Sequence, residues 1–224
     1  MSALQRRFER RREAIAASVV PGANTAASSA DDPGEERIRP LLALLEVLES
    51  RYPDLAGHGE LVGAYSVITG ESLGLDYDRV DCLLLAGTLH DLGKLVLDED
   101  VLSEPGPLDS AQWRQVMRHP ELGADLLAAS NLDQIGRWIL AHHERPDGEG
   151  YPYRLAGSEI PLEARVLAVA DSYDAMRTDR VYRAAMSHEQ AVEELRRNSG
   201  TQFDGGVVEA LLAALNALEA DATR

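Results

Sequence analysis

The chain has 224 residues, 45% of them hydrophobic, and a formal net charge of -16. This length and composition suit one globular domain with a substantial core, and the longest apolar run is far shorter than the roughly 20 residues that a membrane helix needs. The acidic balance argues against duplex nucleic acid as a partner, because duplex binding depends on many Lys and Arg contacts to phosphate.

Residues 1–34 are predicted to form a flexible N-terminal tail and linker. The first 20 residues carry five arginines against two glutamates, and residues 18–34 read SVVPGANTAASSADDPG, which is linker composition. No apolar stretch of signal-peptide length follows the arginines. Together with the single cysteine, Cys82, in an apolar helical stretch, this predicts a cytoplasmic location.

Residues 35–224 are predicted to form one all-α domain. Apolar residues repeat at helical spacing over 35–50, and no alternating strand pattern follows. Further helices are expected over 58–73, 78–94, 110–118, 120–129, 132–143, 161–176, 187–197 and 206–219. The result is a bundle of about eight or nine helices. Ser187 and Gln190 form a predicted capping box at the start of one of them.

Two irregular stretches interrupt the helices. One, LDEDVLSEPGPLD, follows Lys94, and the other runs from Glu144 to Glu159 and contains the glycine and proline of HHERPDGEGYP. Loops longer than about 12–15 residues without structure of their own are uncommon and often functional. We therefore expect the second loop to serve the site.

His90, Asp91 and Lys94 are close together in the sequence. If the helix over 78–94 is continuous, His90 and Lys94 lie on the same side of its last turn, as a metal-ligand candidate beside a cation. Lys94 is the chain's single lysine, and an ammonium is suited to point-charge contact with a phosphate.

His119, the pair His142 and His143, and Asp171 add further ligand candidates. A lone histidine is more often an ordinary hydrogen-bonded side chain, and Asp171 has the alternative of pairing with Arg165 or Arg180. His188 follows the helix cap Ser187, so solvent is its expected neighbour. Taken together, imidazoles and carboxylates without thiolates suit Fe, Mn or Zn and a hydrolytic site.

The motifs resemble those of the HD-GYP family, a subset of the HD superfamily of metal-dependent phosphohydrolases. The resemblance covers roughly residues 52 to 215 and rests on HDLGKLVLDEDVLSEPGPLDSAQWRQVMRHPELGADLL, ILAHHERPDGEGYPYRLAGSEIPLEARVLAVADSYDAMRTDRVYR and GTQFD. It implies an HD-domain helical bundle. It also implies hydrolysis of cyclic di-GMP to linear pGpG, with GMP left open as a further product.

The resemblance also implies roles for particular residues. The implied metal ligands are His58, His90, Asp91, His119, His142, His143 and Asp171, with Asp91 bridging and Asp54 as an added ligand for a third ion. Lys94 would contact the scissile phosphate, Arg180 and Arg183 would hold phosphate or guanine, and Gly150, Tyr151 and Pro152 would line the substrate pocket. The implied cofactors are two or three divalent ions, Fe or Mn, with a bridging hydroxide that attacks phosphorus in line. Asp91 and Lys94 would then be the catalytic residues.

Two other functions stay open at this point. One is an HD phosphohydrolase for another cyclic dinucleotide or a nucleotide, which a substrate panel would distinguish. The other is a catalytically weak HD module that binds a nucleotide or a partner protein, which would show neither turnover nor two bound ions. Control is expected from a regulatory protein partner, from homodimer formation through the helix over 35–50, or from expression.

Overall fold

The computed structural model describes residues 47, 50–102, 106, 108–128, 130, 132–179 and 184–222. The predicted tail over 1–34 and most of the predicted helix over 35–50 lie outside the described residues. In chain order the elements are α3 (Pro53–Ser72), α4 (Tyr77–Leu89), the 3-10 helix η1 (Leu92–Val96), α5 (Glu99–Leu102), α6 (Ser110–Val116), α7 (His119–Ala128), α8 (Asp133–Leu140), the 3-10 helix η2 (Gly157–Glu159), α9 (Leu162–Arg177), α10 (His188–Arg197) and α11 (Gly205–Ala222). No strand occurs among these elements, which confirms the all-α prediction.

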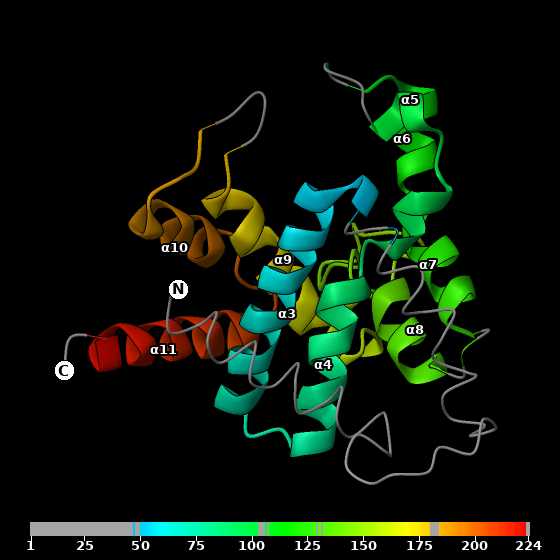
Figure 1. The fold of residues 1–224 in the computed structure, drawn as a ribbon. Helices are drawn as coiled ribbons and strands as arrows, with labels where there is room; N and C mark the ends of the chain where they lie inside the picture. Colours follow the sequence, from blue (N-terminus) through cyan, green and yellow to red (C-terminus); the bar gives the residue numbers. More distant parts are fainter. Residues whose placement is uncertain are drawn as a thin grey trace, which may run out of the picture.

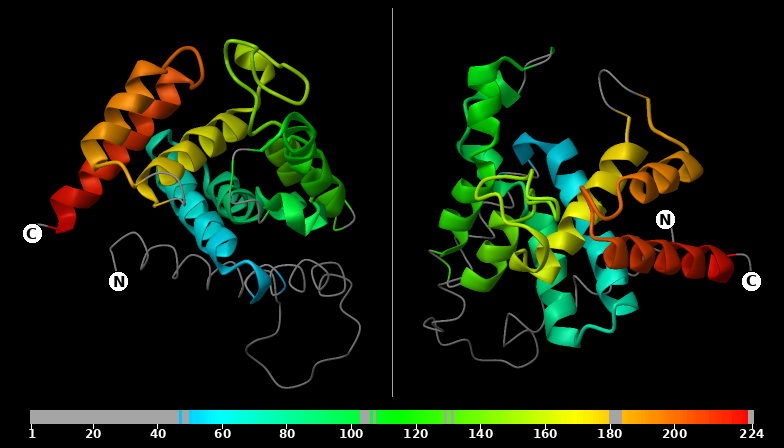
Figure 2. Two further views of the ribbon diagram at one scale, coloured as in Figure 1. Left: turned by 90° about the horizontal axis from the view of Figure 1, so that it is seen from above. Right: turned by 180° about the vertical axis from the view of Figure 1, so that it is seen from behind.

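Helices α3, α4 and α9 form the centre of the bundle (Figure 1). Helices α7 and α8 pack on one side, and α10 and α11 lie side by side on the other, as Figure 2 shows from above. Helices α5 and α6 stand out from the body beside the start of α3. One apolar core joins α3 and α9 to α10 and α11, and a second joins α3, α4 and α9 to α8.

Glycines let α3 and α4 approach closely. A Cβ added at Gly87 of α4 would lie 2.5 Å from the Cα of Gly63 in α3. That separation is far inside the 3.5–4.0 Å of ordinary carbon contact. The close crossing brings the end of α4, which carries the histidine-aspartate pair, against α3.

The chain leaves the α-helix at His90, so the predicted single helix over 78–94 is wrong. Helix α4 ends at Leu89, and Lys94 belongs to the separate 3-10 helix η1. Gly93 in η1 packs so closely on α7 that a Cβ there would lie 2.6 Å from the backbone nitrogen of Gly123. In a 3-10 turn, side chains three apart are eclipsed, so Lys94 meets Asp91 and not His90.

Most other predicted helices lie within a few residues of their observed positions. Helix α3 begins earlier than expected, at Pro53, where a proline suits the first turn. The capping box of Ser187 and Gln190 is confirmed. The short helix α5 lies in an irregular stretch for which no helix was predicted.

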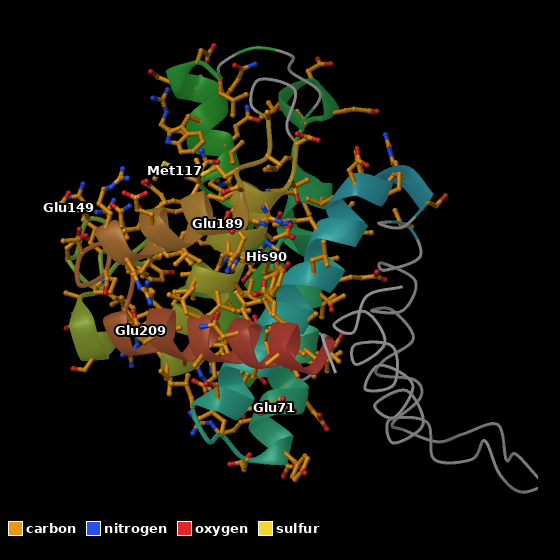
Figure 3. The ribbon with its side chains drawn as sticks, turned by 90° about the vertical axis from the view of Figure 1, so that its left-hand side faces the viewer. Glu71, His90, Met117, Glu149, Glu189 and Glu209 are labelled. Carbon is orange, nitrogen blue, oxygen red and sulfur yellow. The ribbon has the colours of Figure 1, made fainter. Side chains whose placement is uncertain are left out.

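Charged side chains such as Glu149, Glu189 and Glu209 lie on the outside of the molecule, whereas His90 is buried within it (Figure 3). Among the described helices, none is long and apolar enough to cross a membrane. The buried polar side chains are the feature to explain, and half of those among the described residues converge on one site.

Candidate metal centre

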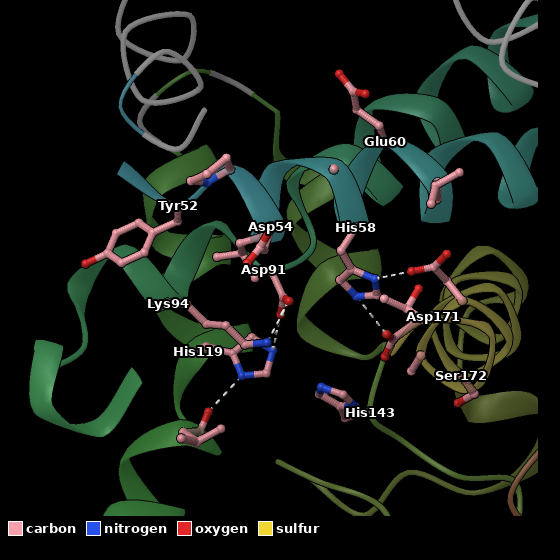
Figure 4. Close-up of a pocket in the computed structure, with 18 of the residues that line it drawn as sticks. Tyr52, Asp54, His58, Glu60, Asp91, Lys94, His119, His143, Asp171 and Ser172 are labelled. Atoms are coloured by element: carbon pink, nitrogen blue, oxygen red, sulfur yellow. Dashed lines mark hydrogen bonds and ion pairs between the residues drawn. The ribbon is translucent and has the colours of Figure 1, made fainter. Parts of the chain in front are cut away.

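The structure brings all seven predicted metal ligands together, and five of them line one cavity: His58, Asp91, His119, His143 and Asp171 (Figure 4). His58 comes from α3, Asp171 from α9 and His119 from the first residue of α7, while His90 with Asp91 and His142 with His143 follow the ends of α4 and α8. Three groups of these residues have ligand atoms within 4.8 Å of one another: His119, His142 and His143; His58, His90 and Asp91; and His90, His142 and Asp171.

Three of the histidines are oriented by their own backbone turn. The Nδ1 atoms of His90, His119 and His142 each lie 2.5–2.7 Å from the carbonyl oxygen three residues earlier, on Gly87, Val116 and Ile139. A carbonyl accepts only, so each Nδ1 carries the proton and each Nε2 keeps its lone pair. This fixes the tautomer in which imidazole binds a metal.

Asp91 is the central carboxylate of the cluster. Its Oδ2 lies 3.4 Å from Nε2 of His90, and its Oδ1 lies 3.4 Å from Nε2 of His119. The Lys94 ammonium donates to Oδ2 at 2.6 Å. Burial opposes ionisation, but Lys94 and the surrounding imidazoles hold the pKa of Asp91 well below its usual range. The carboxylate is therefore ionised and faces two imidazoles with its two oxygens.

His58 lies between two carboxylates of α9. Its Nε2 is 3.1 Å from Oδ1 of Asp171, and its Nδ1 is 2.6 Å from Oδ2 of Asp174. Burial alone would lower the pKa of His58, but the hydrogen bonds to these carboxylates raise it to about 9. A bound cation would neutralise the negative charge of these two carboxylates.

The histidines on the α7 and α8 side are neutral. Burial lowers the pKa of His119 to about 4 and that of His143 to about 3. Burial also holds the pKa of His142 well below its usual range. Neutral imidazole is the form that ligates metal, so these rings need lose no proton to bind an ion.

The structure contradicts two expectations from the sequence. Asp171 does not pair with Arg165, because the Arg165 guanidinium contacts Asp204. His188 does not face solvent alone, because its Nδ1 hydrogen-bonds the Tyr173 hydroxyl at 2.8 Å. Arg180, the other proposed partner of Asp171, lies outside the described residues together with Arg183.

The loop after His143 carries Tyr151 to the cavity. The Tyr151 ring stacks on the His143 ring with centroids 4.7 Å apart, and its backbone nitrogen donates to the His143 carbonyl at 3.2 Å. A Cβ at Gly150 would lie 2.5 Å from Cα of Glu144, so only glycine allows this return of the chain. Glu144, itself buried, accepts from the backbone nitrogens of Tyr153 and Leu155 and holds the loop closed.

Of the three predicted pocket residues, only Tyr151 is among those that line the cavity. Gly150 and Pro152 are not in its wall, so their contribution is to shape the loop.

The cavity above the histidines has a volume of about 1270 Å³. Its floor is polar and includes Asp91, Lys94 and His143, whereas Tyr52 at the start of α3 and Trp113 of α6 belong to its walls. Trp113 is 51% exposed, whereas tryptophan side chains are highly buried on average. Asp54 also lines the cavity, but its carboxylate is in none of the close ligand groups.

Sequence reasoning missed Asp174, Glu144 and Trp113. Asp174 stands three residues after Asp171, so helical periodicity places both on one side of α9, and that signal was available. The role of Trp113 depends on segments far apart in the sequence, and Glu144 closes an irregular loop onto Tyr153 and Leu155, a contact that no helix or strand periodicity predicts.

The donor set fits divalent transition metals. It combines imidazole nitrogens with carboxylate oxygens, contains no thiolate, and is mostly buried. These are ligands that Zn, Fe and Mn accept. The residues present can therefore hold divalent metal ions.

Comparison with known proteins agrees with this geometry. The family described as HD domain matches residues 43–207. The cyclic di-GMP phosphodiesterase response regulator RpfG of Xanthomonas campestris pv. campestris is 39% identical over 189 residues, which is 83% of this chain and 50% of that protein. The 3'3'-cGAMP-specific phosphodiesterase 2 of Vibrio cholerae is 36% identical over 172 residues, which is 75% of this chain and 33% of that protein. The chain thus spans half or less of the length of these two relatives.

A solved structure of an HDG"Y"P protein from Bdellovibrio bacteriovorus superposes with a TM-score of 0.60 at 19% identity. The match covers 72% of this chain and 52% of that chain. At this identity the likeness concerns the fold, and it agrees with the predicted helical bundle.

Proposed function

The chain belongs to the HD domain family, and we propose that it is a metal-dependent phosphodiesterase that hydrolyses cyclic di-GMP to linear pGpG. One observation carries the proposal: seven imidazole and carboxylate side chains cluster at a cavity that five of them line, with a lysine beside the central carboxylate. The similarity to RpfG, which is named as a cyclic di-GMP phosphodiesterase, supports the choice of substrate.

We propose that His58, His90, Asp91, His119, His142, His143 and Asp171 hold two divalent ions, Fe or Mn, with Asp54 as the candidate ligand of a third. When bound, such ions supply a water of lowered pKa and neutralise charge on the phosphoryl oxygens. No side chain of the floor is then needed as a nucleophile.

The residues of the chain bind and orient the substrate. The Lys94 side chain is 24% exposed, and its ammonium is held by Asp91 at 2.6 Å, so it can contact a phosphate that enters the cavity. Among the described residues, Arg51 and Lys94 are the lysine and arginine side chains that line the cavity. Both are ion-paired, Arg51 with Glu99 and Lys94 with Asp91, and acidic residues outnumber them in the lining. Bound divalent ions would therefore supply most of the positive charge that an anionic ligand needs in a protein of net charge -16.

Aromatic walls suit the bases of a dinucleotide. Base stacking on aromatic side chains contributes about 1–3 kcal/mol per base. Tyr52, Trp113 and Tyr151 offer such rings around the floor. A cavity of about 1270 Å³ is large for one nucleotide and accommodates two, because ligand pockets of drug-sized molecules range from roughly 300 to 1,000 Å³.

A second candidate substrate is 3'3'-cGAMP. The cGAMP-specific relative is 36% identical to this chain, close to the 39% of RpfG, so overall identity does not separate the two substrates. Both dinucleotides carry the same two phosphodiesters, and they differ in one base.

Turnover measured by chromatography tests the proposal. The protein, purified anaerobically and supplied with Fe or Mn, should convert cyclic di-GMP to pGpG faster than it converts 3'3'-cGAMP. The Asp91→Asn variant should lose turnover and most bound metal while keeping its helix content by circular dichroism. Fewer than two ions per chain in the wild type, with no product from either dinucleotide, would refute the enzyme assignment.

A further inference from the structure

His58 differs from the other oriented histidines in what holds its Nδ1 atom. His90, His119 and His142 each use a backbone carbonyl from their own turn. His58 instead meets the Asp174 carboxylate at 2.6 Å, across 116 residues of sequence and from helix α3 to helix α9. The contact is therefore made by tertiary packing.

The Nε2 atom of His58 is the ring nitrogen that faces the other ligand candidates. Nδ1 is taken by Asp174, while Nε2 lies 3.1 Å from Asp171, one of the ligand candidates. His58 also belongs to the close group with His90 and Asp91. Both carboxylates can only accept, so each ring nitrogen faces an acceptor; a cation bound beside Asp171 would replace the Nε2 proton, while Asp174 keeps the proton on Nδ1.

Asp174 is built into the wall and is not free to act elsewhere. Its side chain is 3% exposed, and among the described residues its hydrogen-bond partner is His58. An isolated carboxylate in such a place would be costly to bury. It stands one turn after Asp171, so α9 presents one carboxylate to each nitrogen of the same ring.

We propose that Asp174 is a positioning residue that makes His58 a stronger metal ligand than the carbonyl-held histidines. The negative charge of the Asp174 carboxylate beside Nδ1 makes Nε2 a stronger electron donor to a metal, and the hydrogen bond fixes the plane of the His58 ring. Loss of such a partner weakens metal binding by about 10–100-fold in general. This inference rests on the proposed metal site and adds to it a residue that binds no ion itself.

The test is a competition titration of the wild type and variants with Zn²⁺ as the probe and a chromogenic chelator. Asp174→Asn keeps the volume and a hydrogen-bond acceptor but removes the charge, so affinity for one Zn²⁺ ion should fall about 10–100-fold. The matched control is Glu163→Gln, which removes another buried carboxylate of α9, one paired with Arg79 at 2.6 Å and away from the histidines. Its Zn²⁺ affinity should equal that of the wild type.

A double-mutant cycle separates positioning from general structure. In a His58→Ala background, Asp174→Asn should change Zn²⁺ affinity no further, because the ring through which it acts is gone. Equal losses in Asp174→Asn and Glu163→Gln, additive effects in the cycle, or wild-type affinity in Asp174→Asn would each overturn the proposal.

Should Asp174→Asn fail to fold, nuclear magnetic resonance of the Zn²⁺-loaded wild type decides. The His58 proton should lie on Nδ1 and resonate further downfield than the Nδ1 protons of the carbonyl-held histidines. A proton on Nε2 of His58 would overturn the proposal. None of these measurements contains a nucleotide, so the absence of hydrolysis would count against the proposed function and leave the role of Asp174 separately testable.

Discussion

Gly93 offers a sharp test of how the site is assembled. A Cβ at this position would lie 2.6 Å from the backbone nitrogen of Gly123, and closer still to the carbonyl oxygen of His119. Ordinary carbon contacts begin near 3.5 Å, so Gly93→Ala must separate η1 from α7 by roughly 1 Å. Neither obstacle can rotate away, because both belong to the backbone.

Overpacking of this kind costs about 1–3 kcal/mol of unfolding free energy. For a chain of this size, each kcal/mol lowers the melting temperature by about 2–4 °C, so we expect Gly93→Ala to melt about 2–12 °C below the wild type. The same separation moves Asp91 away from His119, and metal binding should weaken as well.

The assay is thermal unfolding followed by circular dichroism, with metal content measured on the same samples. Gly136→Ala is the control, since a Cβ there would lie 3.5 Å from its nearest neighbour, the Ala124 carbonyl oxygen, in ordinary contact. It should melt at or above the wild-type temperature, because alanine favours helix over glycine by about 1 kcal/mol. A Gly93→Ala protein with wild-type melting temperature and metal content would refute this account of the packing.

Three further predictions concern two side chains that line the cavity and one ion pair outside it. Lys94→Arg keeps the charge but changes its reach, so metal content should stay while turnover falls by about 10–100-fold; unchanged turnover would remove Lys94 from the reaction. Trp113→Ala should raise the KM for cyclic di-GMP by about 5–150-fold with little change in kcat, as expected for about 1–3 kcal/mol of lost stacking, and a change confined to kcat would contradict this. Burial opposes ionisation of Asp204, but the hydrogen bonds from Arg165 and from backbone nitrogens lower its pKa. The stability it adds is therefore complete above the usual aspartate pKa and is lost as pH falls through the lowered value. The difference in unfolding free energy between wild type and Asp204→Asn should be constant near neutral pH and shrink below about pH 4, and a difference that persists in acid would be inconsistent with this pairing.

The sequence by itself determined the helical class and the candidate ligand types that the structure brings together. Helix periodicity is local, so most helices could be placed within a few residues. The ligand types could be recognised because His90 with Asp91 and His142 with His143 are adjacent in the chain. Helical spacing would also have placed Asp174 beside Asp171, because both stand on one helix.

Only the tertiary structure decided how these groups meet. The break after Leu89 arises because η1 must fit against the backbone of α7, and no local propensity encodes that fit. Likewise, Asp171 could have paired with Arg165, but packing gives that arginine to Asp204 and leaves Asp171 to His58. Hydrogen bonds and ion pairs between distant segments depend on which helix faces which, and that is set by the shared core, not by the neighbouring residues in the chain.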